Sequence, residues 1–81
     1  MVVEKSRCAC CYYYTIESVA DICPVCYWQK DFYQEKYIDD NGGPNSTSLR
    51  ESRENFKKYD VIDQVFKAYV RSPLQEEIIQ A

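Results

Sequence analysis

The sequence predicts a small α+β fold in which a β-hairpin comes first and two helices follow. All five cysteines lie before residue 27, and β-forming residues fill the segment between them. A helix-capping sequence and an apolar repeat of four residues appear only after residue 47. A chain of 81 residues has room for one hydrophobic core, so residues 1–81 are expected to form a single domain.

The cysteines form two C-x-x-C pairs. The sequence CACC at residues 8–11 contains the first pair, CPVC at residues 23–26 is the second, and eleven residues separate them. A short loop with two thiolates directs both sulfurs at one centre, and two such loops supply the tetrahedral S₄ shell that Zn²⁺ prefers. We therefore predict one structural zinc ion, with these ligands: Cys8, Cys11, Cys23 and Cys26.

Other interpretations of the cysteines are weaker. Iron fits the same S₄ cage, since the geometry alone does not separate the two metals. Disulfides are disfavoured because the cysteine count is odd and no export signal precedes them, and no βαβ pattern supports a redox-active pair. Cys10 is left over and is expected to be a small buried hydrophobe or a partly exposed thiol, although its use as a ligand remains the alternative.

The hairpin is expected between the two pairs. Residues 12–17 (YYYTIE) are rich in β-formers, and residues 18–21 can turn the chain back toward Cys23. A two-stranded hairpin is marginal in water, so a metal at its open end would hold it. The arrangement predicted is zinc-ribbon-like.

Two helices are expected in the second half. The sequence SLRE at residues 48–51 is a capping box, which predicts a helix ending near Tyr59. Asp60 would cap a second helix, because apolar pairs recur every four residues as far as Val70. The tail, residues 74–81, either packs back on the core or frays.

A polar loop precedes the first of these helices. Its sequence NGGPN, residues 41–45, is typical of a turn and is interpreted as a solvated connector. Asn45, Arg53 and Asn55 are expected to have structural roles, tying this loop to the N-terminus of the helix through side-chain to backbone hydrogen bonds.

Acidic residues exceed basic ones only in the cysteine-rich half. The formal net charge is −3; residues 1–47 hold four basic and seven acidic side chains, and residues 48–81 hold six of each. Zn²⁺ with four thiolates adds two further negative charges, so the metal-bound protein would carry about −5. This balance disfavours nucleic acid as a partner and favours a basic protein.

Aromatic residues are too many for one small core. The chain has one tryptophan, eight tyrosines and three phenylalanines, so several rings are expected at the surface, where they suit protein–protein contact. The residues we predict to contact a partner are an aromatic anchor and the acidic side chains near it: Trp28, Asp31, Glu35, Asp39 and Asp40.

These motifs together resemble the cysteine-rich CPCC family of small bacterial proteins. The resemblance runs from Cys8 to about Glu77 and rests on the two cysteine pairs, on residues 41–45, on the capped helix and on RSPL at residues 71–74. Two positions of the first pair depart from the family pattern, since Ala9 stands where the family has proline and Tyr12 where it usually has glycine. Because the family is defined by its cysteines, the resemblance implies little about activity.

An enzyme is not expected. The chain has no histidine, a closed S₄ shell leaves no open position for a substrate, and no pair of carboxylates is recognisable. We predict an inhibitor or immunity protein that blocks a basic toxin, such as a nuclease. The alternatives are a zinc-ribbon adaptor for nucleic acid or a transcription or translation assembly, with a basic edge at Lys57, Lys58, Lys67 and Arg71, and a metal-stabilised subunit without separate activity.

A cytoplasmic location is expected from the reduced cysteines. The sequence shows neither a signal peptide nor an apolar run long enough to span a membrane, so no membrane association is expected.

Overall fold

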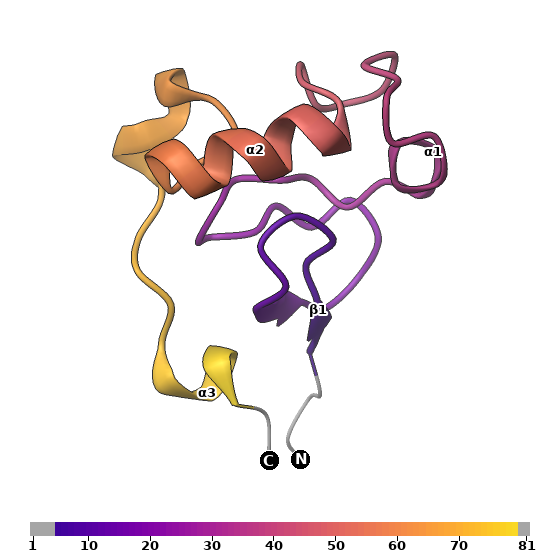
Figure 1. Cartoon of the computed structure of the whole chain (residues 1–81). Helices are drawn as coiled ribbons and strands as arrows, with labels where there is room; N and C mark the ends of the chain where they lie inside the picture. Colours follow the sequence, from indigo (N-terminus) through magenta and orange to yellow (C-terminus); the bar gives the residue numbers. More distant parts are fainter. Residues whose placement is uncertain (1–4, 80–81) are drawn as a thin grey trace.

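The computed structural model describes residues 5–79 and has the α+β character that the sequence predicts. In Figure 1, the long helix lies across the cysteine-bearing loops, and the chain that follows runs down one side and brings the last helix beside the hairpin. The elements in chain order are β1 (Ser6–Arg7), β2 (Tyr14–Ile16), α1 (Phe32–Lys36), α2 (Leu49–Tyr59), the 3₁₀ helix η1 (Gln64–Tyr69) and α3 (Gln75–Ile78).

The predicted strand exists, but its predicted partner was wrong. β2 lies within residues 12–17 and pairs with β1, which precedes the first cysteine pair, so that Ser6 lies opposite Ile16 and Arg7 opposite Tyr14. The first cysteine pair is therefore itself the turn of this hairpin. A strand of only two residues has no periodicity of its own, so β1 could not be predicted from the residue pattern.

The turn expected at residues 18–21 forms and leads into a second, separate hairpin. The carboxylate of Asp21 accepts hydrogen bonds from the backbone N–H groups of Glu17 (2.9 Å) and Ser18 (3.0 Å). The chain then makes an antiparallel bridge between Ile22 and Gln29, with the second cysteine pair at its tip. Each cysteine pair thus has a hairpin of its own.

The first predicted helix is confirmed. The second is a 3₁₀ helix and not an α-helix, and it begins after Asp63 and not after Asp60. Ser48 caps α2 by accepting a hydrogen bond from the N–H of Glu51. Asp60 is not a helix N-cap: it has φ 62° and ends α2, with its N–H bonded to the carbonyl of Phe56. The next segment is the 3₁₀ helix η1, capped by Asp63.

The conformation of Asp60 and the hydrogen bonds that follow it explain why no α-helix starts there. Asp60 has φ 62°, in the left-handed region, whereas a helix N-cap is extended. The carbonyl of Ile62 accepts from the side chain of Asn55 (2.8 Å), and the N–H of Phe66, which would pair with it in such a helix, donates to Asp63. The N–H of Ile62 donates to the carbonyl of Cys26 (3.0 Å) and fixes this segment beside the second cysteine pair. Ile62 itself is buried.

The loop at residues 41–45 is fixed by a buried polar network that the sequence did not indicate. Gln34 of α1 is fully buried; its amide oxygen accepts from the N–H of Asn45. Its amide nitrogen donates to the carbonyl of Asn45 and to those of Asp40 and Thr47, which flank the loop. A Cβ on Gly43 would lie 2.6 Å from Gln34, so only glycine fits there without a shift. Asn45 also bonds both backbone groups of Gln29. The loop is thus tied to α1 and the second hairpin, and not to α2 as predicted.

The tail packs back on the molecule as far as the structure describes it. Arg71 makes two 2.8 Å bonds to the carboxylate of Glu77, whose side chain is only 2% exposed, and this pairing lowers the pKa of Glu77 below its usual value. The backbone N–H of Arg71 also donates to the carbonyl of Pro24. Through these contacts α3 lies against β2.

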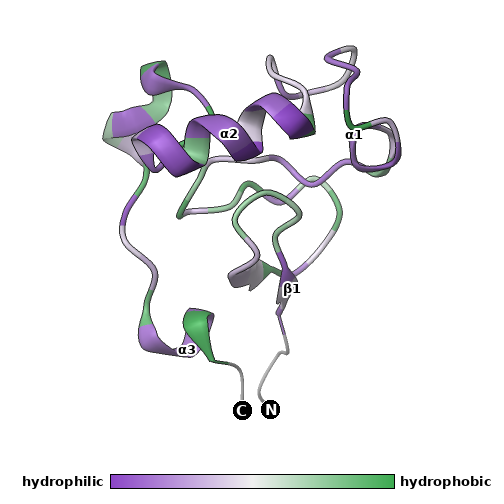
Figure 2. Ribbon diagram, viewed as in Figure 1, coloured by the Kyte–Doolittle hydropathy of each residue, from purple (hydrophilic) through white to green (hydrophobic). Residues whose placement is uncertain are grey.

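The core is small and consists mainly of the cysteines. The buried apolar side chains are Cys8, Cys10, Cys11, Ile16, Cys23, Val25, Cys26, Trp28, Leu49, Val61 and Ile62. Figure 2 shows hydrophilic colours along most of α2 and hydrophobic ones over much of the cysteine loops, whereas α3 carries both. Among residues 5–79, no helix has the length and apolar character needed to cross a membrane.

Candidate metal centre

The two cysteine pairs adopt the same backbone turn. In residues 8–13 and again in residues 23–28, the N–H of the first cysteine donates to the carbonyl of the sixth residue, and its carbonyl accepts from the N–H of the fifth, all at 2.9 Å. The fifth residue has a positive φ in both, 67° at Tyr12 and 77° at Tyr27. We call these turns the first and second knuckle. Tyr12 adopts the left-handed conformation that a glycine would reach without strain, so its presence does not change the turn.

The knuckles bring four sulfurs together. The Sγ atoms of Cys8, Cys11, Cys23 and Cys26 all lie within 4.8 Å of one another. Cys8 and Cys26 are 3.5 Å apart and Cys11 and Cys23 are 3.7 Å apart. A tetrahedral ion with bonds of about 2.3 Å, as for zinc and thiolate, would space its sulfurs about 3.8 Å apart. The cluster therefore has the dimensions of an S₄ metal site and could hold a metal ion.

The sulfurs are buried and accept hydrogen bonds. Cys8, Cys23 and Cys26 are completely buried and Cys11 is 9% exposed. The hydroxyl of Thr15 donates to the sulfur of Cys23 (3.0 Å), and the N–H of Trp28 donates to that of Cys26 (3.4 Å). Donors of this kind stabilise a thiolate and hold it in place.

Protonation of the cluster depends on the neighbouring thiols. Hydrogen bonding to Cys23 and burial raise the pKa of the Cys11 thiol, and hydrogen bonding to Cys10 and the other thiols raises the pKa of Cys26. The pKa of Cys23 is lowered, because Cys11 and Thr15 among others bond to it. Four thiolates cannot share this volume without a cation, so metal binding must displace protons from the cluster.

The family can now be stated. The model of the cysteine-rich CPCC proteins matches residues 6–77, which is almost the whole chain. The chain belongs to this family. No curated protein matches it.

The knuckles of this CPCC protein form a closed site. All four positions of a tetrahedral ion would be filled by sulfur, and no side chain with oxygen or nitrogen ligands lies among the four grouped residues. A site of this kind holds segments of chain together and offers no position to a substrate.

Cys10 is buried but stands outside the group of four. Its side chain is 3% exposed and packs in the core, as expected for a small hydrophobe. The four sulfurs that converge are those of the C-x-x-C spacing.

The predicted contact residue Trp28 belongs to the interior, and that prediction was wrong. Its side chain is fully buried, and its indole N–H donates to the carboxylate of Glu35 (3.1 Å). Glu35 in turn pairs with Lys30 at 2.6 Å and accepts from the N–H of Asp31. Glu35 therefore fixes the buried ring of Trp28, the last residue of the second knuckle. Trp28 is not available as a surface anchor, and Glu35 is not a free charge.

The other predicted acidic contacts all have partners within the chain. Asp31 caps α1, accepting from the N–H of Gln34. Asp39 forms an exposed ion pair with Arg50 at 2.5 Å, which lowers the pKa of Asp39. Asp40 accepts from the hydroxyl of Tyr33, and this bond lowers the pKa of Asp40 and raises that of Tyr33.

Sequence reasoning missed the residues that support the cluster from outside. Thr15 is 6% exposed, and its only sequence signal is its alternation with Tyr14 in a β-forming run. Arg53 was assigned to the polar loop, but its Nε donates to the carbonyl of Ala9 (3.0 Å) in the first knuckle. Neither role follows from residue type alone.

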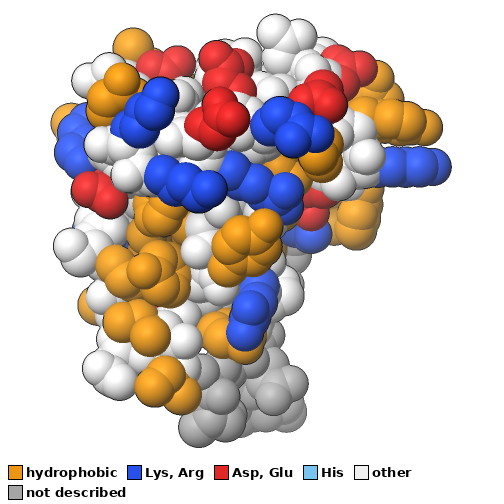
Figure 3. Space-filling model, in the orientation of Figure 1, with side chains coloured by type: hydrophobic (Ala, Val, Ile, Leu, Met, Phe, Trp, Pro, Cys, Tyr) orange, Lys and Arg blue, Asp and Glu red, His pale blue; other side chains and the backbone are white. Residues whose placement is uncertain are grey.

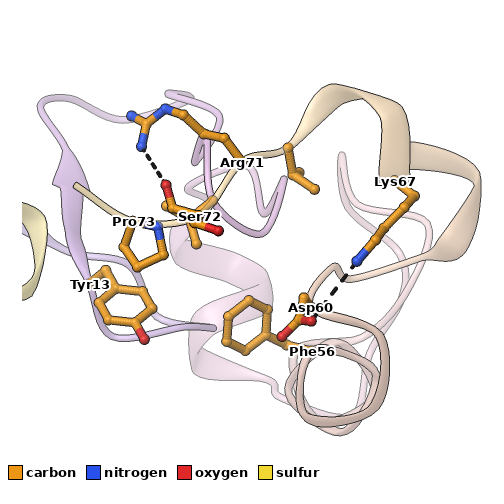
Figure 4. A pocket seen from close by; sticks show the side chains of 9 residues that line it. Tyr13, Phe56, Asp60, Lys67, Arg71, Ser72 and Pro73 are labelled. Carbon is orange, nitrogen blue, oxygen red and sulfur yellow. Dashed lines mark hydrogen bonds and ion pairs between the residues drawn. The ribbon is translucent and has the colours of Figure 1, made fainter.

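A groove of about 410 Å³ lies beside the cluster (Figure 4). Tyr13, Phe56 and Pro73 form its apolar walls. The cations at its rim are already engaged: Lys67 bonds the carbonyl of Tyr59 and approaches Asp60, and Arg71 bonds the Ser72 carbonyl as well as Glu77. The groove thus presents no free charged group for a ligand.

Proposed function

We propose that this CPCC protein is a non-enzymatic binding module in which one zinc ion has a structural role. The observation that carries the proposal is the set of four buried sulfurs at the spacing of a tetrahedral thiolate site, with no open position. Zinc suits four thiolates and has no redox chemistry of its own. Because the remaining core is small, zinc binding would supply much of the folding free energy.

We propose further that the module binds a basic protein, in the manner of an inhibitor or immunity protein for a basic toxin. The net charge of −3 supports this partner, and zinc with four thiolates would bring it to about −5. An acidic protein of this size associates quickly with a basic cleft, such as that of a nuclease, through electrostatic steering.

The contact surface that fits this role is α1. The two aromatic side chains of the helix and that of its C-cap residue are exposed, Phe32 by 66%, Tyr33 by 47% and Tyr37 by 49%. The helix below them is held rigidly by the buried side chain of Gln34 and by the Asp31 cap. Exposed rings on a rigid support lose little entropy on binding, which is typical of interface hot spots.

The test is affinity capture with matched variants, followed by identification of the partner. We expect the zinc-loaded protein to retain one basic protein at equal stoichiometry and to suppress its toxic activity. Tyr37→Ala should lose the partner, whereas Tyr69→Ala, a ring 68% exposed on η1, should retain it. An acidic partner, or equal capture by both variants, would contradict the proposal.

A further inference from the structure

A line of cations runs along one side of α2. Arg50, Arg53 and Lys57 are spaced i, i+3 and i+7, which places them on the same side of a helix. Glu51 lies further round the helix, whereas Glu54, four residues after Arg50 and three before Lys57, borders this line. Figure 3 shows adjoining blue side chains across this face, with red and blue side chains mixed above them and orange ones beneath.

Two arginines on this side lie over tyrosine rings. The guanidinium carbon of Arg53 is 5.3 Å from the ring centre of Tyr12, and that of Arg7 is 5.0 Å from the ring centre of Tyr14. Arg7 and Tyr14 face each other across β1 and β2. The first knuckle and its hairpin therefore continue the cationic line of α2 with paired arginines and aromatic rings.

Three of these cations have no carboxylate partner in the part of the chain that the structure describes. The ion pairs found among residues 5–79 engage Lys30, Arg50, Lys67 and Arg71. Arg7, Arg53 and Lys57 are in none of them. Arg53 uses only Nε, toward the carbonyl of Ala9, so its two terminal nitrogens stay open to an anion.

Tyr12 combines an exposed ring with a strained backbone conformation. Its φ of 67° lies in the left-handed region, which a residue with a side chain adopts with a penalty of about 1–2 kcal/mol. Its ring is nevertheless 52% exposed, so packing does not repay the penalty. Strain at an exposed aromatic residue points to a use for the ring outside the fold.

We propose that this cationic–aromatic face, made of Arg7, Tyr12, Tyr14, Arg53 and Lys57, binds single-stranded nucleic acid. Cations with no partner would neutralise phosphates, and an exposed tyrosine ring would stack on an unpaired base. The proposal is independent of the basic partner at α1, because it uses a different surface. The overall negative charge is compatible with it, since no ion pair among residues 5–79 engages Arg7, Arg53 or Lys57.

An acidic protein is the competing occupant and is less well matched. Carboxylates would satisfy the arginines and the lysine, but an acidic segment offers no planar group for the ring of Tyr12. A duplex also fits poorly, because its bases are stacked inside and unavailable to the tyrosines.

The experiment is fluorescence anisotropy of the zinc-loaded full chain with labelled single strands of about 12 nucleotides, one of uridine and one of thymidine, which compares RNA with DNA. With three phosphates neutralised, log K should fall against log salt with a slope of about −2 between about 50 mM and about 200 mM salt. Absence of binding to both strands, or a slope near zero, would overturn the proposal. So would equal affinity for a duplex, or equal competition by polyglutamate.

Two neighbouring lysines provide the matched control. Lys57 and Lys58 are both exposed and neither forms an ion pair within residues 5–79, but they lie on different sides of α2. Lys57→Ala should reduce the size of the salt slope by about 0.7, whereas Lys58→Ala should leave it unchanged. Equal effects of the two substitutions would mean diffuse charge attraction and would overturn the assigned face.

Tyr12→Gly separates binding from folding. Glycine accepts the left-handed conformation, so the variant should keep its zinc and its fold while losing affinity for the single strands by about tenfold. Tyr12→Phe keeps the ring and should bind as the unmodified protein does. Full affinity of the folded Tyr12→Gly protein would show that the ring does not stack on a base.

Discussion

The two knuckles share one backbone turn and differ in what surrounds them. The second is bonded to three other segments. The carbonyl of Cys26 accepts from the N–H of Ile62, and the carbonyl of Pro24 accepts from the N–H of Arg71. The side chain of Asn45 bonds both backbone groups of Gln29, the residue that follows the knuckle. The first is attached to α2 by one side-chain bond, from Arg53 to Ala9. Contacts with other segments of the chain therefore stabilise the second knuckle, whereas the first would depend on the metal for its stability.

The residue that follows each pair shows the same contrast. Tyr27 packs on Phe66, with ring centres 4.4 Å apart, and approaches Tyr69. Tyr12, at the equivalent position, is half exposed and has only Arg53 over its ring. Ring stacking thus offsets the backbone strain at Tyr27, whereas Tyr12 is strained and exposed to solvent.

The largest effect should come from metal removal. Chelation should remove an amount of folding free energy on the order of 10 kcal/mol, as for other small thiolate zinc sites. Hydrogen exchange of the zinc-loaded protein should show weaker protection in the first knuckle, at Cys8 and Tyr12, than in the second, at Cys23 and Tyr27. An unchanged fold after complete chelation would refute the structural role, and equal protection of both knuckles in the zinc-loaded protein would refute the contrast between them.

A smaller set of variants separates the ligands from the spare thiol. Cys11→Ser should abolish stoichiometric zinc binding, because it removes one of the four sulfurs. Cys10→Ser should keep one zinc per chain and cost about 1–2 kcal/mol, since it places a hydroxyl in the core. Elemental analysis and thermal unfolding measure both quantities. Loss of zinc in Cys10→Ser would mean that the first knuckle binds differently.

The smallest effect concerns the two strained tyrosines. Glycine relieves the positive φ at either position, so Tyr12→Gly should raise the free energy of unfolding by about 0.5–1 kcal/mol, because the relief of strain exceeds the larger entropy that glycine loses on folding. Tyr27→Gly has the same backbone gain but loses the stacked ring, and it should destabilise the fold by about 2 kcal/mol. Denaturant unfolding of the zinc-loaded proteins gives both values. Equal values would mean that the surroundings of the two knuckles are energetically alike.

The sequence was most informative where chemistry and spacing coincide. The four cysteines that converge are those of the two C-x-x-C pairs, because a short loop has few ways to present two sulfurs. The start of α2 followed from its capping box at Ser48. Both are local features and need no knowledge of the rest of the fold.

Features that depend on long-range contacts could not be predicted in this way. The apolar repeat after Asp60 suggests an α-helix, but Asp60 is left-handed and Asn55 takes the carbonyl of Ile62, so none starts there. Trp28 and Gln34 carry no sign of complete burial, since a tryptophan beside charged residues and a glutamine in a short helix both suggest a surface. The burial of both side chains depends on how the chain packs around the second knuckle, and the sequence predicts only the metal ligands of that knuckle.

We propose that one zinc ion in a closed shell of four sulfurs joins the two unequally supported knuckles. X-ray absorption spectroscopy at the zinc edge of the purified protein measures this shell. We expect four sulfur neighbours at about 2.3 Å and no nitrogen or oxygen neighbour. Fewer than four sulfurs, a mixed shell, or the absence of zinc from the folded protein would refute the closed four-sulfur site.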